Sequence, residues 1–245
     1  MSNKRVAVCL SGEARTFKDT YKSLTKFLPN ADIFIYTWNT SKNSWKDTIQ
    51  GFKLVEQVVT EEELRDVYKP TRICVVDHPS HLQIENVHLP LKYKGKCRAD
   101  KISPQKHNYL PMYWGIYKAD LLRQTYSSDY DIVVRSRPDI EIISDLELYH
   151  GSGVYYTPMN PLDGTDVSVW SQWRANDFFA YGDLLSMELY SSRFCELTHD
   201  WNTEVAENGN ILSSEESLKK YLDARGVRTH PIFPDHCTLV RELLK

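Results

Sequence analysis

Two arginines and an aspartate follow directly on a short apolar run in the middle of the chain. Residues 130–143 read YDIVVRSRPDIEII, so Arg135, Arg137 and Asp139 stand at the end of a predicted strand. Pro138 biases Arg137 toward an extended backbone, which predicts that the alternation continues and that the three charged side chains project to one side. Two guanidinium groups suit fork-like binding of a diphosphate, and a carboxylate beside them can hold a divalent cation or pair with an arginine. A plain Arg–Asp ion pair at a strand end is the equally weighted alternative.

A second candidate anion site follows the first apolar run of the chain. Residues 11–16 read SGEART and include Ser11, Gly12 and Arg15, where a predicted strand gives way to a predicted helix. Such a turn offers a flexible glycine, backbone N–H donors and a guanidinium group to an anion. The patterns GxxxxGK[ST] and GxGxxG are both missing, so this is neither a P-loop nor a Rossmann fingerprint. A strand-to-helix turn with one glycine is common, and an ordinary turn is the more frequent explanation of such a stretch.

The elements that must position these residues alternate between strand and helix in the first half of the chain. Apolar runs predict strands, and apolar residues at helical spacing predict helices between them. The predicted strands are 5–10, 31–38, 72–77 and 130–134, and the predicted helices are 16–28, 60–68 and 109–126. Repeated strand–helix–strand units imply a largely parallel sheet.

The second half of the chain is less regular. Residues 153–158, 177–182 and 227–233 read as strands, and residues 184–194 read as a helix. A last helix is predicted to open at Ser213, because Glu216 stands three residues later as its capping-box partner, and to stop at Gly226. The predicted class is therefore α/β, with a mostly parallel, mixed sheet flanked by helices.

Composition limits the partners that we expect. The 245 residues fit one large α/β domain, and the formal charge of −3 with a pI near 6.2 argues against nucleic acid as the main partner. No stretch approaches the length of a membrane span. The 5 cysteines show no CxxC pair, so neither a disulfide framework nor a zinc site is indicated and we expect a reduced, cytoplasmic chain.

Six short stretches along the chain carry a resemblance to a known family. They are, in order, VAVCLSGEART, NADIFIYTW, MYWGIYKADLL, YDIVVRSRPDIEI, NDFFAYG and SSEESLKKYL. From about Arg5 to Ile232 the chain resembles a family of glycosyltransferases found in bacterial surface-polysaccharide clusters and large DNA viruses. The resemblance implies a single GT-A-like domain over residues 1–245, with a Rossmann-like nucleotide-binding half to about residue 140 and an acceptor-binding half beyond it. For a viral member, the cytoplasm would be that of the host.

The resemblance also implies a substrate class and a cofactor. The donor would be a nucleotide-sugar, a UDP-sugar first among the candidates, and the acceptor would be a hydroxyl group of a glycan or another molecule. GT-A enzymes hold Mn²⁺ or Mg²⁺ with a DxD motif after a central strand, and many add a late histidine. Here only Asp139 matches the second carboxylate, and His236 is the best match to the histidine, with His230 second.

The departure from DxD puts metal dependence in doubt. A diphosphate leaving group develops negative charge that either a cation or fixed arginines can stabilise. The arginines that stand at this place to supplement or replace a metal are Arg15, Arg135 and Arg137.

The remaining expected site residues also follow from the resemblance. Asn176 and Asp177 match an Asn–Asp pair before an aromatic strand, which places Asp177 near the acceptor hydroxyl as a proton acceptor. Glu216 is the second candidate base, although its capping-box role competes with this interpretation. Lys118 is the least core-like residue of the helix that would line the nucleotide pocket.

Two other functions stay open at this point. A sugar-phosphate nucleotidyltransferase shares the Rossmann-like half, but its loop after the first strand is usually richer in glycine and carries a lysine that SGEART lacks. A catalytically silent protein that binds nucleotide-sugars is the alternative outside the enzymes.

Overall fold

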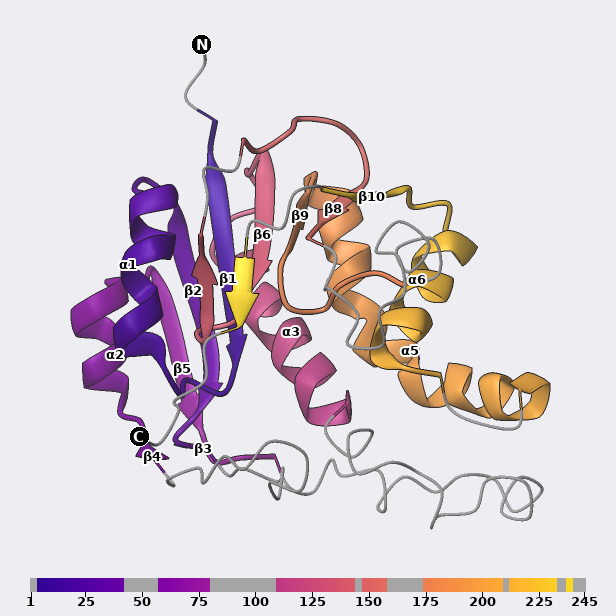
Figure 1. Ribbon diagram of the computed structural model, residues 1–245, viewed down its shortest axis with the longest axis horizontal. Helices are drawn as coiled ribbons and strands as arrows, with labels where there is room; N and C mark the ends of the chain where they lie inside the picture. Colours follow the sequence, from indigo (N-terminus) through magenta and orange to yellow (C-terminus); the bar gives the residue numbers. More distant parts are fainter. Residues whose placement is uncertain are drawn as a thin grey trace.

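The structure is a computed structural model, and it describes residues 4–41, 57–79, 109–143, 147–157, 174–208, 212–232 and 237–239. These ranges contain one large sheet, two small ones and five helices (Figure 1). The predicted α/β class with a mixed sheet and flanking helices is confirmed.

Seven strands form the large sheet in the order β10-β8-β9-β6-β1-β2-β5. Their bounds are β1 (Val6–Gly12), β2 (Asp32–Trp38), β5 (Arg72–Val76), β6 (Ile132–Ser136), β8 (Val154–Tyr156), β9 (Ala180–Gly182) and β10 (Thr229–Pro231). Every neighbouring pair is parallel except the two pairs that β9 makes with β6 and β8. The sheet therefore continues without a break from the first half of the chain into the second.

The two small sheets each contain two antiparallel strands. One pairs β7 (Ile140–Ile142) with β11 (Cys237–Leu239), and the other pairs β3 (Thr40–Ser41) with β4 (Gln57–Val58). Because β7 begins four residues after the end of β6, the connection between them is a tight turn that contains Arg137 and Asp139.

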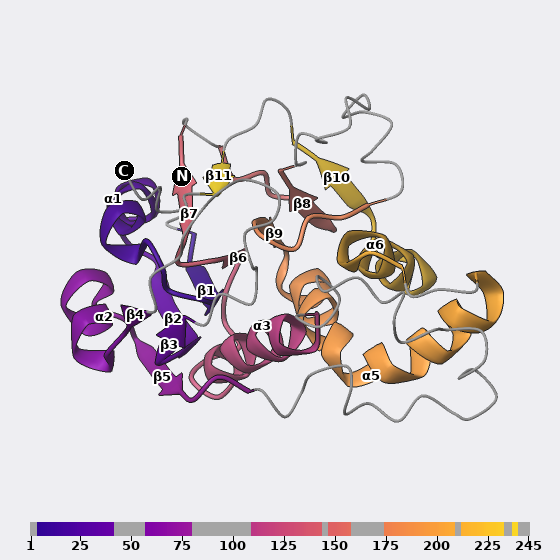
Figure 2. The same cartoon turned by 60° about the horizontal axis from the view of Figure 1, so that its bottom comes forward.

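Helices cover both faces of the large sheet. On one face lie α1 (Phe17–Phe27) and α2 (Glu61–Tyr68), whereas α3 (Tyr109–Gln124), α5 (Leu184–Asn208) and α6 (Ser214–Ala224) lie on the other (Figure 2). The central strands are buried on both sides, which explains why their sequences are continuous apolar runs rather than alternating ones.

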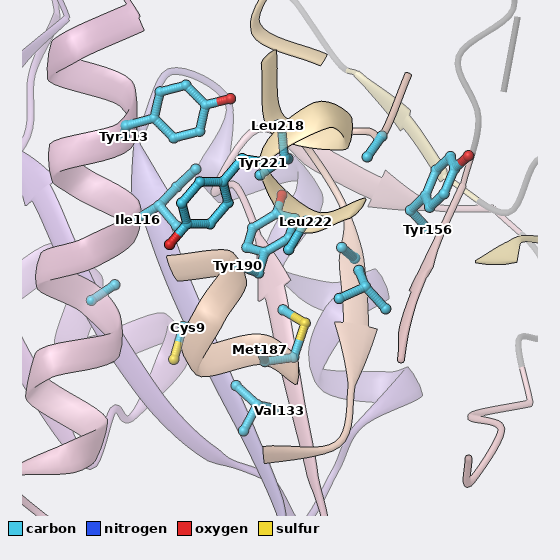
Figure 3. Packing of buried hydrophobic residues seen from close by; sticks show 14 of the residues in the cluster. Cys9, Tyr113, Ile116, Val133, Tyr156, Met187, Tyr190, Leu218, Tyr221 and Leu222 are labelled. Atoms are coloured by element: carbon cyan, nitrogen blue, oxygen red, sulfur yellow. The ribbon is translucent and has the colours of Figure 1, made fainter. Parts of the chain in front are cut away.

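Strand β1 shows how the two cores divide. Val8 and Leu10 point into the core beneath α1 and α2, and Ala7 and Cys9 point into the core beneath α3 and α5. Figure 3 shows side chains of α3, α5 and α6, among them Tyr113, Tyr190 and Tyr221, gathered over Cys9 of β1 and Val133 of β6. This packing brings the beginning of α6 to the same side of the sheet as α3.

The capping box predicted at the start of the last helix is confirmed, and a second one closes the start of α2. Thr60 and Glu63 close the start of α2, and Ser213 and Glu216 close the start of α6. Gly226, predicted to stop the last helix, has a φ of +69°, a left-handed conformation that favours glycine.

Two predicted strands are wrong in their extent, and both errors concern the site. Strand β6 ends at Ser136, and the turn over Pro138 closes with a hydrogen bond from the Ile140 N–H to the Arg137 carbonyl, so the alternation does not continue to Asp139. Strand β9 begins only at Ala180, because the Asn176 side chain accepts a hydrogen bond from the Phe178 N–H and turns the chain there. The predicted helix 184–194 is also too short, since α5 continues to Asn208.

Candidate anion-binding site

The candidate site lies where the strand order of the large sheet reverses. From β1 the chain proceeds outward through β2 and β5 on one side and returns through β6 on the other. Open α/β sheets bind ligands outside the carboxyl ends of the strands at such a reversal. The loops that leave the carboxyl ends of β1 and β6 are the two stretches predicted as anion sites.

The structure brings these two loops together. A Cβ atom placed on Gly12 would lie 3.8 Å from Cγ of Arg137 and 3.9 Å from its Nε. Gly12 has a φ of +112°, and its carbonyl accepts a 2.6 Å hydrogen bond from Oγ1 of Thr37. A side chain at this position would be strained, so the loop depends on glycine for its course past Arg137.

Arg15 is paired within its own loop. Its Nε lies 2.5 Å from Oε2 of Glu13, and both side chains are mostly buried. The charge of Arg15 is therefore matched locally, and a ligand anion would compete with Glu13 for it.

Arg137 and Asp139 form a fork-like ion pair across the turn. The Arg137 Nε donates to Oδ1 of Asp139 at 2.7 Å, and its Nη2 donates to Oδ2 at 2.6 Å. Burial disfavours the charge on Arg137, but Asp139 outweighs this effect, so the pKa of Arg137 is raised. The Arg137 side chain stays 14 % exposed and lies over the Phe178 ring at 5.0 Å, whereas Asp139 is 0 % exposed. Arg137 is thus the member of the pair that a ligand can reach.

The residues described here do not fit the divalent cation that the family resemblance implies. Oxygen ligands are what Mg²⁺ and Mn²⁺ require, and both oxygens of Asp139 already accept hydrogen bonds from Arg137. Within the described ranges, no group of three or more His, Cys, Asp or Glu side chains could hold a metal. His236 lies outside the described residues, and His230, on β10, stacks on the ring of Tyr155.

Arg135 is buried, and it has no carboxylate partner among the described residues. It is 1 % exposed, and its Nη1 donates to the carbonyls of Ser11 (3.1 Å) and Ser136. Its Nε and Nη2 are buried without a hydrogen-bond partner among the described residues, as is the Ser11 hydroxyl. Burial lowers the pKa of Arg135 to about 10, with a further contribution from Arg137, so the group stays charged near neutral pH.

Asp177 is the carboxylate that faces this buried charge. It is 1 % exposed, and its Oδ1 has no hydrogen-bond partner among the described residues. Burial first and Glu215 second raise the pKa of Asp177 to about 7, while Ser214, Arg137 and Arg135 oppose that shift. A carboxyl group that titrates near neutral pH is suited to accept and return a proton.

Two tyrosines outside the predicted site residues form hydrogen bonds to the segments beside Asp177. The Tyr190 hydroxyl of α5 donates to the Asn176 carbonyl at 3.0 Å, and the Tyr113 hydroxyl of α3 donates to the Ser214 carbonyl at 2.8 Å. Helical spacing predicts only that these rings belong to the core. Their hydroxyl groups gain a role because α3, α5 and α6 converge at this point.

Asn176 and Glu216 have structural partners. The Asn176 amide donates to the Thr157 carbonyl, and its oxygen accepts from the Phe178 N–H at 2.6 Å. Oε2 of Glu216 accepts from the Ser213 N–H at 3.1 Å, and its Oε1 pairs with Arg174 at 3.1 Å. Partial burial works against ionisation, but these partners outweigh it and lower the pKa of Glu216. The contacts of Glu216 are those expected for a residue of a capping box.

Lys118 lies apart from the cluster formed by Gly12, Arg135, Arg137, Asp139 and Asp177. Its Nζ is 4.8 Å from the centre of the Trp114 ring on α3, and its charge acts on Cys74 of the edge strand β5. The structure therefore joins the loops after β1 and β6 with Asp177 and leaves Lys118 beside another part of the sheet.

Comparisons with known proteins add no assignment to this geometry. Neither the scan against protein-family models nor the search of curated proteins found a match to the chain. In the described part of the chain, none of the helices has the length and apolar character needed to cross a membrane.

Proposed function

We propose that this protein is a GT-A-like glycosyltransferase that moves a sugar from a nucleotide-diphosphate donor, a UDP-sugar first among the candidates, to a hydroxyl acceptor in glycan assembly. The observation that carries the proposal is the meeting of the Gly12 loop with Arg137 at the point of strand reversal. This place offers backbone donors, a reachable guanidinium and a further buried positive charge to an anion.

The charges of the cluster support a diphosphate as the ligand. Arg137 is neutralised by Asp139, but the charge of Arg135 has no carboxylate partner at ion-pair distance within the described residues. When Asp177 is protonated, the cluster carries a net positive charge. An anion at the rim of the cluster, beside Gly12 and Arg137, would offset this charge. Little water is present there, so electrostatic interactions are strong.

The proposed transfer uses Asp177 as the proton acceptor. The acceptor oxygen bonds to the anomeric carbon, the bond from that carbon to the diphosphate oxygen breaks, and its electron pair leaves with the nucleoside diphosphate. The acceptor proton passes to the Asp177 carboxylate. Arg137, and Arg15 once released from Glu13, stabilise the charge on the leaving group in place of the metal that a DxD motif would hold. Because Asp177 is buried, the residues packed against it must move to admit the acceptor.

Nucleotide binding is the first test of the proposal. We expect UDP and UDP-sugars to raise the melting temperature of the full chain and to bind in calorimetry. Arg137→Gln should weaken UDP binding tenfold or more, which corresponds to about 1.4 kcal/mol. The matched control is Arg65→Gln, which removes a surface arginine that pairs with Glu61 on α2 and should leave the affinity unchanged. Stabilisation by no nucleotide-sugar would overturn the proposal.

Product analysis separates the remaining functions. A glycosyltransferase releases a nucleoside diphosphate, whereas a sugar-phosphate nucleotidyltransferase releases pyrophosphate. A silent binding protein binds the nucleotide and forms neither product with any acceptor extract. The burial of Asp177 is the observation that favours the alternative of a binding protein without catalytic activity.

A further inference from the structure

The burial of Arg135 separates it from any ligand at the rim. Its position in β6 is in register with Cys9 of β1 and Ala180 of β9, so it lies within the sheet and not on a loop. At 1 % exposure, its guanidinium cannot be touched by a donor unless the surrounding core opens. The chain would fold at a lower free-energy cost with an apolar residue of similar volume at this position, because that residue would bury no charge and leave no donor unsatisfied.

The contacts of Arg135 point inward, toward the other parts of the site. Its Nη1 donates to the carbonyl of Ser11, which immediately precedes Gly12, and to the carbonyl of Ser136, which immediately precedes Arg137. One guanidinium therefore connects the carboxyl ends of β1 and β6, the two strands from which the rim loops depart. These contacts fix the loops relative to each other.

Arg135 pairs across the sheet with Ala180, three residues after Asp177, and its charge lowers the pKa of Asp177, as the charge of Arg137 does to a greater extent. Arg135 of β6 and Arg137 of the turn after it act on Asp177 from one side, and Glu215 and the hydrogen-bonding Ser214 act on it from α6. Three phenols of the other helices also interact with its charge, Tyr109 and Tyr113 of α3 and Tyr190 of α5, and burial raises their pKa values so that they stay neutral. Since Arg137 is already engaged by Asp139, Arg135 is the cation without a competing carboxylate partner among the described residues.

We propose that Arg135 is a positioning residue that does not contact the donor and instead holds Asp177 in its charged, proton-accepting form while tying together the ends of β1 and β6. This inference rests on the proposed function, because it assigns the proton acceptor of that same reaction to Asp177. It also revises the sequence-based expectation that Arg135 binds the substrate directly.

The titration of Asp177 tests the electrostatic part of the inference. Carbon-13 NMR of the chain labelled at aspartate carboxyl carbons, with Asp177→Asn used to assign the signal, reports the midpoint directly. In Arg135→Met the midpoint should move up by about one pH unit, as expected when a nearby opposite charge is removed. Arg135→Lys keeps the charge and should move it less. If Arg135→Met does not fold, Arg135→Gln serves as the neutral variant. An unchanged midpoint in the neutral variant would overturn the inference.

Nucleotide affinity tests whether Arg135 touches the donor. With UDP as the probe at pH 8.5, the Arg135→Met chain should bind within about threefold of the unchanged chain, whereas Arg137→Gln should lose tenfold or more. A tenfold loss in Arg135→Met would assign Arg135 to donor contact and overturn the inference. If the unchanged chain binds no UDP, the proposed function fails, while the Asp177 titration still decides whether Arg135 acts on that carboxylate.

Discussion

Arg135 and Arg137 stand two residues apart at the end of one strand, yet their environments are opposite. Arg137 is partly exposed and donates hydrogen bonds to both oxygens of Asp139, so its charge is fully paired. Arg135 is buried in the sheet. Among the described residues it donates hydrogen bonds only to backbone carbonyls, and two of its nitrogens have no partner. Two arginines only two residues apart thus differ completely, one in a satisfied ion pair and the other an unsatisfied buried charge.

Paired and unpaired buried charges differ in what they contribute to stability. A paired buried charge is expensive to break, whereas an unpaired buried charge is itself a cost that folding must offset. Buried polar groups that lack hydrogen-bond partners are expected mainly at functional sites. The Arg137–Asp139 pair therefore stabilises the turn, and the proposed chemistry falls to the region of Arg135 and Asp177.

The largest expected effect comes from breaking the satisfied pair. Asp139→Ala should lower the free energy of unfolding by about 3–5 kcal/mol, because it leaves the Arg137 charge largely buried and unpaired. It should also abolish transfer, since Arg137 would lose its orientation. Urea unfolding measures the first effect and a transfer assay measures the second. The double variant Arg137→Gln with Asp139→Asn should recover part of the stability. A loss below about 1 kcal/mol in Asp139→Ala would contradict the pairing.

The pH dependence of stability tests the environment of Asp177, near the unpaired Arg135. Its pKa is about 7 in the folded chain and about 3.9 in an unfolded one, so the folded state binds the proton that the unfolded state releases. The stability from this group is present at low pH and is lost as the pH rises from about 4 to about 7. Asp177→Asn should therefore raise the free energy of unfolding at pH 8 by roughly 1–3 kcal/mol and remove this pH dependence.

A surface aspartate supplies the control for that measurement. Asp129, whose side chain is 96 % exposed, should change neither stability nor its pH dependence when replaced by asparagine. Chemical denaturation at several pH values between 4 and 8 gives both quantities. Equal slopes for the unchanged chain and Asp177→Asn would show that Asp177 does not titrate as described.

Glu216 should give a smaller effect, which separates capping from catalysis. Glu216→Ala removes one half of the capping box of α6 and the pair with Arg174, so we expect a loss of about 1 kcal/mol in the free energy of unfolding. Transfer and UDP binding should be retained at temperatures where the variant is folded. A folded Glu216→Ala chain without transfer activity would restore Glu216 as a candidate base.

Removal of divalent cations should have the smallest effect. Because Asp139 is engaged by Arg137, we expect EDTA to change the affinity for UDP by less than about twofold, in contrast to enzymes whose metal carries the diphosphate. Calorimetry with EDTA and with added Mn²⁺ measures the difference. A large gain with Mn²⁺ would show that the cation displaces Arg137 from Asp139 or finds ligands beyond the described residues.

Much of this protein follows from its sequence alone. Continuous apolar runs and helical spacing indicated the buried strands and helices of the first half, because burial on both faces of a parallel sheet imposes those patterns. The capping boxes at Thr60 and Ser213 were readable because their partners lie three residues away. The adjacency of the Gly12 and Arg137 loops was also predictable, since the ends of parallel strands share one edge.

Only the tertiary structure decided how the charges pair. Sequence spacing left open whether Asp139 binds a metal or an arginine, and the turn over Pro138 decided it by directing Asp139 back to Arg137. The isolation of Arg135 and the environment of Asp177 arise where β1, β6, α3, α5 and α6 meet, from segments distant in the chain. Local sequence determines elements and their ends, but the pairing of a buried charge depends on what long-range packing places beside it.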